Sequence, residues 1–113
     1  MSKPLVIVES PYAGDIERNM AYARAAMRDC LTRGEAPLAS HVLYAHSGVL
    51  DDLDPVQRQS GIDAGLAWGR AAHLTAVYVD LGISRGMEEG IAAAHAAGCE
   101  VVFRSLPAWA ASA

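Results

Sequence analysis

The stretch AVYVDLGISRGMEEG, residues 76–90, decides the fold. It continues an apolar, β-rich run, 75–79, and Asp80 stands where that strand is expected to end. A glycine-spaced turn, 82–86, follows, and Met87 begins a segment with helical periodicity. A carboxylate at the carboxyl end of a strand, a loop with backbone N–H groups and a helix N-terminus together predict a small-molecule site.

On either side of this stretch, strand and helix patterns alternate. We expect strands at residues 5–8, 38–43, 75–79 and 100–104, and helices at residues 16–33, 55–72 and 87–97. Asp15 and the pair Asp54-Pro55 are N-terminal signals for the first two helices. Right-handed crossovers then predict an α/β three-layer fold with a four-stranded parallel sheet in the order 2-1-3-4. Ligands bind at the switch point of such a sheet, beside loops 9–14 and 80–86.

Size, composition and charge exclude several classes of protein. A chain of 113 residues predicts one domain, residues 1–113, and the formal charge of −4 with a single lysine argues against a partner that is a nucleic acid polymer. No apolar run approaches ~20 residues, so no membrane span is expected. Neither a secretory signal nor metal spacing of Cys30 and Cys99 is present, and we expect a cytoplasmic protein with buried free thiols.

The turn at residues 82–86 formally matches G-x-S-x-G, the pattern of a nucleophile elbow. We reject that interpretation because only His95 follows the serine, in the middle of an expected helix. Two interpretations stay open. The side chains of Ser84 and Arg85 with the N–H groups around Gly86 hold a phosphate or carboxylate, or the segment is a turn capped by Ser84.

Glu88 and Glu89 fall in the first turn of the third expected helix, where the helix dipole favours carboxylates. Adjacent helical positions point about 100° apart, so at most one of the two can face a ligand. A carboxylate kept ionised there suits attack on a sugar carbon. Asp80 is a second candidate, with turn formation as its alternative role, and Asp63 a third, with a surface position as its alternative.

Two further features carry weaker signals. The cluster of His41, His46 and three aspartates, at 51, 52 and 54, has metal-binding residue types without ligand spacing, so no metal or other cofactor is expected. His41 is interpreted as a pocket wall or a strand-end residue. Glycines at 61, 65 and 69 predict either close approach of another backbone, such as that of a neighbouring subunit, or a weak helix held by tertiary contacts.

Several of these features together resemble the nucleoside 2-deoxyribosyltransferase-like superfamily, and more narrowly a small branch frequent in phage and actinobacterial genomes. They are SPYAG at 10–14, Asn19 in the helix that follows, Pro37 and His41, the aspartate that follows the third strand, and GMEEG at 86–90. The resemblance is strongest in HVLYAHSGVLDD, 41–52, and DLGISRGMEEGI, 80–91. Glu9 departs from it, because the superfamily usually has a small residue there.

The resemblance implies a flavodoxin-like, Rossmann-like fold and cleavage of N-glycosidic bonds in nucleosides or nucleoside monophosphates. It implies that Glu88 is the nucleophile that attacks C1′ of the sugar, and that Asp80 or Asp63 lies near the base. It also implies oligomers whose sites borrow residues from a neighbour. The residues implied to bind the substrate are Ser10, Tyr12, Gly14, Asn19, His41, Asp63, Ser84, Arg85 and Gly86.

We therefore expect an N-glycosidase or deoxyribosyltransferase that acts on a nucleoside or nucleotide and forms a homodimer or larger homo-oligomer. Glu88 and Asp80 are its expected catalytic residues. The alternative is a non-catalytic protein on the same fold that binds or sequesters a nucleotide-derived small molecule. A third possibility is an interaction module that uses the glycine row at 61–69 and the tail around Trp109.

Overall fold

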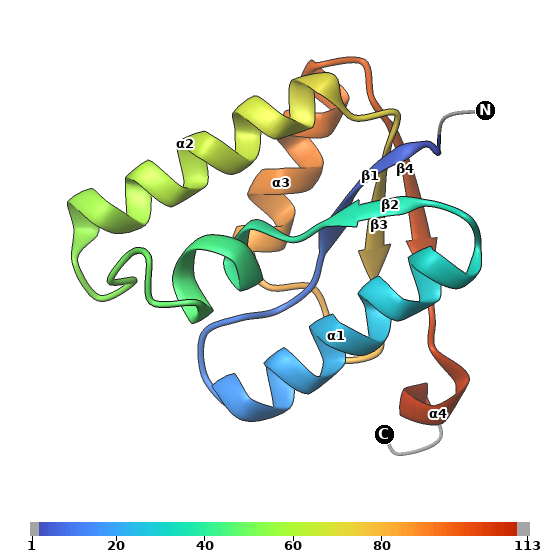
Figure 1. The fold of residues 1–113 in the computed structure, drawn as a ribbon, viewed down its shortest axis with the longest axis horizontal. Helices are drawn as coiled ribbons and strands as arrows, with labels where there is room; N and C mark the ends of the chain where they lie inside the picture. Colours follow the sequence, from blue (N-terminus) through green and yellow to red (C-terminus); the bar gives the residue numbers. More distant parts are fainter. Residues whose placement is uncertain (1–2, 111–113) are drawn as a thin grey trace.

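The computed structural model describes residues 3–110, in which four strands form one sheet between two layers of helices (Figure 1). The strands are β1 (Leu5–Glu9), β2 (Ala36–Leu38), β3 (Leu74–Tyr78) and β4 (Glu100–Arg104). All neighbouring strands are parallel, and their order is β2-β1-β3-β4. The predicted fold class and strand order are therefore confirmed.

The helices divide between the two faces of this sheet. They are α1 (Ile16–Thr32), the π-helix η1 (His41–His46), α2 (Pro55–Ala71), α3 (Arg85–Ala96) and the short α4 (Pro107–Ala110). In Figure 1, α1 and α4 lie on one side of the sheet, and α2 and α3 lie together on the other. Asp15 and Asp54 cap α1 and α2 as predicted, because their carboxylates accept N–H groups of the first helical turn.

The side chains of β1 alternate between the two faces, as in any strand. Val6 and Val8 point to the α1 face and are almost fully buried against Tyr22 and its neighbours. Ile7 and Glu9 point to the opposite face, toward α2 and α3. One strand thus supplies the dry core on one side and a carboxylate on the other.

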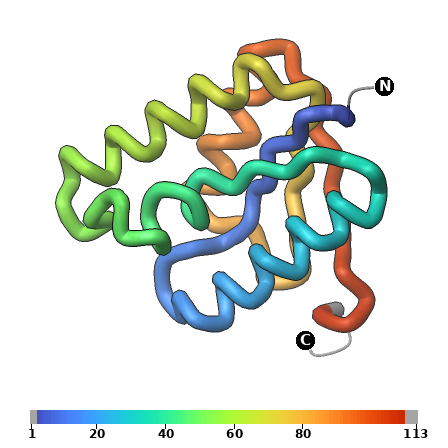
Figure 2. Tube along the Cα trace, in the orientation of Figure 1, coloured from blue at the N-terminus to red at the C-terminus, as the bar shows by residue number. Residues whose placement is uncertain are grey.

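The predicted strand at residues 38–43 is wrong in most of its length. Strand β2 ends at Leu38, and the chain then turns into η1, where the N–H groups of Val42 and Leu43 both bond to the carbonyl of Ala39. The β-rich composition of this run is overridden by tertiary packing, because η1 lies beside α2, as the trace in Figure 2 shows.

Contacts within this chain account for two of the three glycines at 61, 65 and 69 in α2. A Cβ added to Gly61 would lie 3.0 Å from Leu50 Cδ1, and one added to Gly65 would lie 2.9 Å from the hydroxyl of Ser40. Gly69 has open space beside it. Two of the three glycines therefore let α2 approach the side chains of the segment that follows β2, rather than a second backbone.

The described part of the tail packs against α1. The ring of Trp109 meets the ring of Tyr22 edge to face, with centroids 5.0 Å apart. Residues 111–113 of the predicted tail lie outside the described residues.

Candidate functional site

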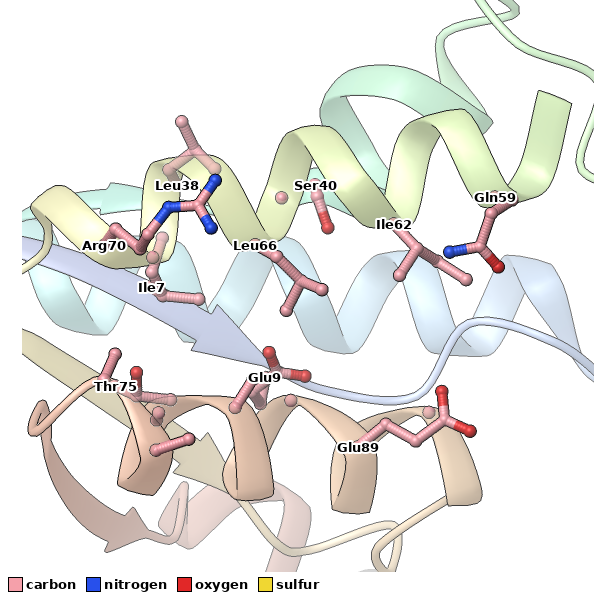
Figure 3. Close-up of a pocket in the computed structure, with 18 of the residues that line it drawn as sticks. Ile7, Glu9, Leu38, Ser40, Gln59, Ile62, Leu66, Arg70, Thr75 and Glu89 are labelled. Carbon is pink, nitrogen blue, oxygen red and sulfur yellow. The ribbon is translucent and has the colours of Figure 1, made fainter.

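Two cavities open on the α2 and α3 side of the sheet and meet at the end of β1. The smaller has a volume of about 360 Å³ and the larger, between α2 and α3, about 690 Å³. The residues that line both are Glu9, Ser40, Arg58, Ile62 and Gly86. In Figure 3, Ile62 and Leu66 point into the larger cavity from α2, and Glu9 lies on its floor. This cleft lies at the carboxyl end of β1, beside the predicted switch point.

Glu9 is the carboxylate at the centre of this cleft. It is the last residue of β1, it is partly buried, and it lies against Gly90 of α3. Burial raises the pKa of its carboxyl group from 4.5 to about 7. A carboxyl group that titrates near neutrality is suited to acid–base or nucleophilic chemistry at physiological pH.

Ser10 and His41 form a hydrogen-bonded pair in the wall of the smaller cavity. The hydroxyl of Ser10 lies 2.9 Å from Nε2 of His41, and Ser10 is itself buried. Burial lowers the pKa of His41 to about 4, so its imidazole is neutral at pH 7. The ring of Tyr12 meets that of His41 edge to face, with centroids 6.2 Å apart. These residues give the cavity a polar, aromatic wall without a positive charge.

The loop after β1 is held in shape by Asn19 of α1. The Nδ2 atom of Asn19 donates hydrogen bonds to the carbonyls of Tyr12 and Ala13, at 2.8 and 3.1 Å. Gly14 has a φ of +101°, which favours glycine. Neither Asn19 nor Gly14 lines either of the two cavities, so both act on the site through the shape of this loop.

The N-terminus of α3 forms the opposite wall. The hydroxyl of Ser84 accepts the N–H of Met87 at 3.3 Å, so the interpretation of this segment as a Ser84-capped turn is confirmed. Helix α3 begins at Arg85, two residues earlier than predicted. The exposed side chain of Arg85 lies 3.7 Å from the carboxylate of Glu89. Ser84, Arg85 and Gly86 all line the smaller cavity, where an anion could meet the first N–H groups of the helix.

A family model described as a domain of unknown function, DUF7768, matches residues 4–104. The chain belongs to the DUF7768 family. No curated protein matches it. Among solved structures, the DUF7768 chain is similar to a 2-deoxyribosyltransferase from the psychrotolerant bacterium Bacillus psychrosaccharolyticus, with a TM-score of 0.62 and 15% identity over 89% of this chain and 72% of that one. At this identity the likeness shows a shared fold.

Most of the predicted binding residues come together in the DUF7768 protein. The smaller cavity is lined by Ser10, Tyr12, His41, Ser84, Arg85 and Gly86. Asp63 lies apart on the exposed side of α2, where its carboxylate accepts a hydrogen bond from Gln59 at 2.9 Å. Its alternative role as a surface residue is the one that the structure supports.

The structure does not bring Asp80 to the cleft. The Asp80 carboxylate accepts hydrogen bonds from the hydroxyls of Tyr22 and Ser105 and from the N–H of Leu106. Although burial opposes it, these bonds hold the pKa of Asp80 below its ordinary value. Asp80 lines neither cavity, because its side chain turns toward α1 and the C-terminal segment. The expected catalytic position of Asp80 is therefore corrected to a structural one.

The structure also separates Glu88 from the cleft. Glu88 is exposed in the first turn of α3 and lines neither cavity, whereas Glu89 lines the larger one. The prediction that at most one of the pair faces a ligand site agrees with this geometry, but the residue that does so is Glu89. In Figure 3, Glu89 extends from α3 toward Gln59 at the end of the larger cavity.

In the sequence, Glu9 stands out as a departure from the family pattern and as the first residue of loop 9–14, and neither feature predicts a catalytic role. The available signal was a carboxylate that directly follows the apolar run 5–8 at the predicted switch point. Its burial depends on Gly90, which lies far away in the sequence.

Among residues 3–110, no three His, Cys, Asp or Glu side chains gather as a metal site would require. No helix in the same range combines the length and hydropathy needed to cross a membrane.

Proposed function

We propose that this protein breaks or exchanges the N-glycosidic bond of nucleosides or nucleoside 5′-monophosphates, with Glu9 as the carboxylate that attacks C1′ of the sugar. The observation that carries the proposal is a partly buried carboxyl group with a raised pKa where two cavities meet. The fold shared with a 2-deoxyribosyltransferase supports the reaction class. Because a fold hosts many functions, the chemistry of Glu9 carries more weight than the likeness.

In the proposed reaction, an ionised oxygen of Glu9 forms a bond to C1′ while the C1′–N bond breaks. The electron pair of that bond leaves with the base, which takes a proton from solvent. Water then attacks C1′, loses a proton to solvent and releases the sugar and the Glu9 carboxylate. Attack by the nitrogen of a second base completes a transfer instead. Since Glu9 must be ionised, activity rises with pH through about 7.

In this proposal, one wall of the smaller cavity contacts the base and the opposite wall contacts the 5′ end of the substrate. We assign the base to the aromatic wall of Tyr12, His41 and Tyr44, whose rings offer faces and edges for stacking. The hydroxyl of Ser10 is oriented by His41 and suits a sugar hydroxyl. We assign the 5′ end to the opposite wall, around Ser84 and the N-terminus of α3.

The test is chromatographic detection of free base after incubation with ribo- and deoxyribonucleosides and their 5′-monophosphates. Wild-type protein should release base from at least one substrate, and Glu9→Gln should lower that rate by about 100-fold or more while the protein stays folded. Retention of full activity in Glu9→Gln would contradict the role of Glu9. Absence of release from every substrate, with binding detected by thermal shift, would favour the non-catalytic alternative.

We also propose the predicted homo-oligomer. Exposed apolar side chains in the loop before α2 and in its first turn support it, since Val49, Leu53 and Val56 are 67%, 93% and 79% exposed. Light scattering should give a mass of at least two chains, and Leu53→Asp should shift it toward one. A wild-type protein that remains a monomer at about 100 µM would overturn this proposal, because an interface with a Kd at or below that concentration would give a substantial fraction of dimer.

A further inference from the structure

We infer that Gly90 is a positioning residue that leaves room for the catalytic carboxylate, and that α3 can supply this carboxylate in place of β1. A Cβ added to Gly90 would lie 2.6 Å from the carboxyl carbon of Glu9 and 2.8 Å from its Oε1. Real Cβ atoms do not approach other atoms so closely. The Glu9 carboxyl group therefore occupies the space that any larger residue at position 90 would need. This inference rests on the proposed function.

Backbone conformation does not explain a glycine at this position. Gly90 is in the middle of α3 and has no positive φ, whereas Gly82 and Gly98, which flank the helix, have φ values of +86° and +71°. Glycine in a helix interior is unfavourable relative to alanine. Since its conformation demands no glycine, the space taken by Glu9 is the reason that the structure offers.

The same distances make the carboxylate exchangeable. In a glutamate side chain, Cβ and the carboxyl carbon are separated by two C–C bonds, which is about 2.5 Å. The Glu9 carboxyl carbon lies 2.6 Å from the Cβ position of residue 90. The length of a glutamate side chain at position 90 therefore matches the distance to the point where the Glu9 carboxyl carbon now lies, and the exchange requires that Glu9 be replaced by a small residue.

The surroundings of the carboxylate would be unchanged by this exchange. Glu9 and Gly90 both line the larger cavity, and Gly86, one turn earlier on α3, lines both cavities. A carboxylate delivered from α3 would therefore enter the same cleft. With Glu9 still present, however, a glutamate at position 90 would place two carboxylates in one space, which sterics and like charge both oppose.

The test compares base release by Glu9→Ser, Gly90→Glu and the double variant Glu9→Ser/Gly90→Glu. Each single variant should lose about 100-fold or more in kcat/KM, and the double variant should recover at least tenfold over Glu9→Ser. Such a rescue is not expected if Gly90 matters only for packing. A folded double variant that is no more active than Glu9→Ser would overturn the exchange.

Gly90→Ala tests the positioning role, with Ala92→Gly as the control in the same helix because Ala92 is exposed and lines neither cavity. Gly90→Ala should lower kcat/KM at least tenfold and move the midpoint of the pH profile away from about 7, whereas Ala92→Gly should do neither. If Gly90→Ala fails to fold, Glu9→Asp/Gly90→Ala, with a shorter carboxylate, should restore folding. An unchanged rate and midpoint in Gly90→Ala would overturn the role.

One readout is independent of the reaction. The carboxyl carbon of Glu9 can be titrated by ¹³C NMR in the wild-type protein and in Gly90→Ala. If the wild-type protein releases no base, the proposed function fails, but a displaced Glu9 pKa in Gly90→Ala would still support the positioning role. An identical titration in both proteins would overturn it.

Discussion

The two faces of the sheet differ sharply. On the α1 face, Tyr22, Ala26, Cys30 and Tyr78 are completely buried. On the other face, α2 contributes no buried residue, and two cavities separate it from the sheet and from α3. The alternation of side chains along β1 connects the two, since Val8 enters the core and Glu9 enters the cleft. The α1 face therefore stabilises the fold, and the face covered by α2 and α3 is available for chemistry.

A network of polar groups reinforces the α1 face. Arg104 donates two hydrogen bonds to the carboxylate of Glu35, at 2.7 and 2.8 Å, and a third to the hydroxyl of Tyr78 at 3.2 Å. Those bonds with Arg104, opposed by burial, hold the pKa of Glu35 below its ordinary value. The side chains of Arg104 and Glu35 are only 9% and 12% exposed, so the network belongs to the core.

Arg104→Ala should produce the largest loss of stability. It leaves the Glu35 carboxylate buried without its cation, and we expect the free energy of unfolding to fall by about 3–5 kcal/mol. Arg33→Ala is the control, because Arg33 is half exposed in its pair with Asp29 and should cost about 1 kcal/mol or less. Urea unfolding monitored by circular dichroism measures both. Equal losses would show that the buried Arg104–Glu35 pair is no more important to stability than an exposed ion pair.

Glu9→Gln should raise the free energy of unfolding above pH 7, by less than Arg104→Ala lowers it. The raised pKa of Glu9 means that the folded state binds more protons than the unfolded state between pH 4.5 and about 7. Wild-type stability should therefore fall as pH rises through this range, by up to about 3 kcal/mol. The variant cannot ionise and should be more stable than the wild type at pH 8 but not at pH 4. Parallel stability curves from pH 4 to 8 would show that the cleft is not strained by this charge.

Asp80→Asn should change the free energy of unfolding by a smaller amount still. The amide cannot accept all the hydrogen bonds that Tyr22, Ser105 and Leu106 donate, so the free energy of unfolding should fall by about 1–3 kcal/mol. Base release per folded molecule should be unchanged. Asp63→Asn, on the exposed side of α2, should change neither quantity. If Asp80→Asn abolishes base release in folded protein, the α1 face takes part in the chemistry and the division of roles fails.

Sequence patterns were sufficient for most of the architecture. Apolar runs and the caps Asp15 and Asp54 predicted the three long helices, because these signals are local. Right-handed crossovers between the expected strands then predicted the strand order. The run at 38–43 misled the prediction because its Ser40 packs closely against Gly65 of α2 and the chain turns there into η1. Local propensity could not anticipate that contact.

The candidate site was harder to predict than the fold. The loops that line the smaller cavity, 9–14 and 80–86, were predicted because they follow strands at the switch point, and the resemblance added Ser10 as a binding residue. The directions in which the carboxylate side chains point were not predicted, because each direction is set by a partner that is distant in the sequence. Asp80 turns to Tyr22, which lies 58 residues before it, and Glu9 turns to Gly90. Residue type and spacing do not contain such information.

The most direct test of the central claim is to locate the covalent sugar adduct. A 2′-fluoro-substituted nucleoside slows release of the glycosyl group from the enzyme, and peptide mass spectrometry then identifies the modified carboxylate. The account predicts an adduct on Glu9, in the segment between Leu5 and Arg18, and none in Glu9→Gln. An adduct on Glu88 or Glu89, or base release with no adduct on any carboxylate, would contradict it.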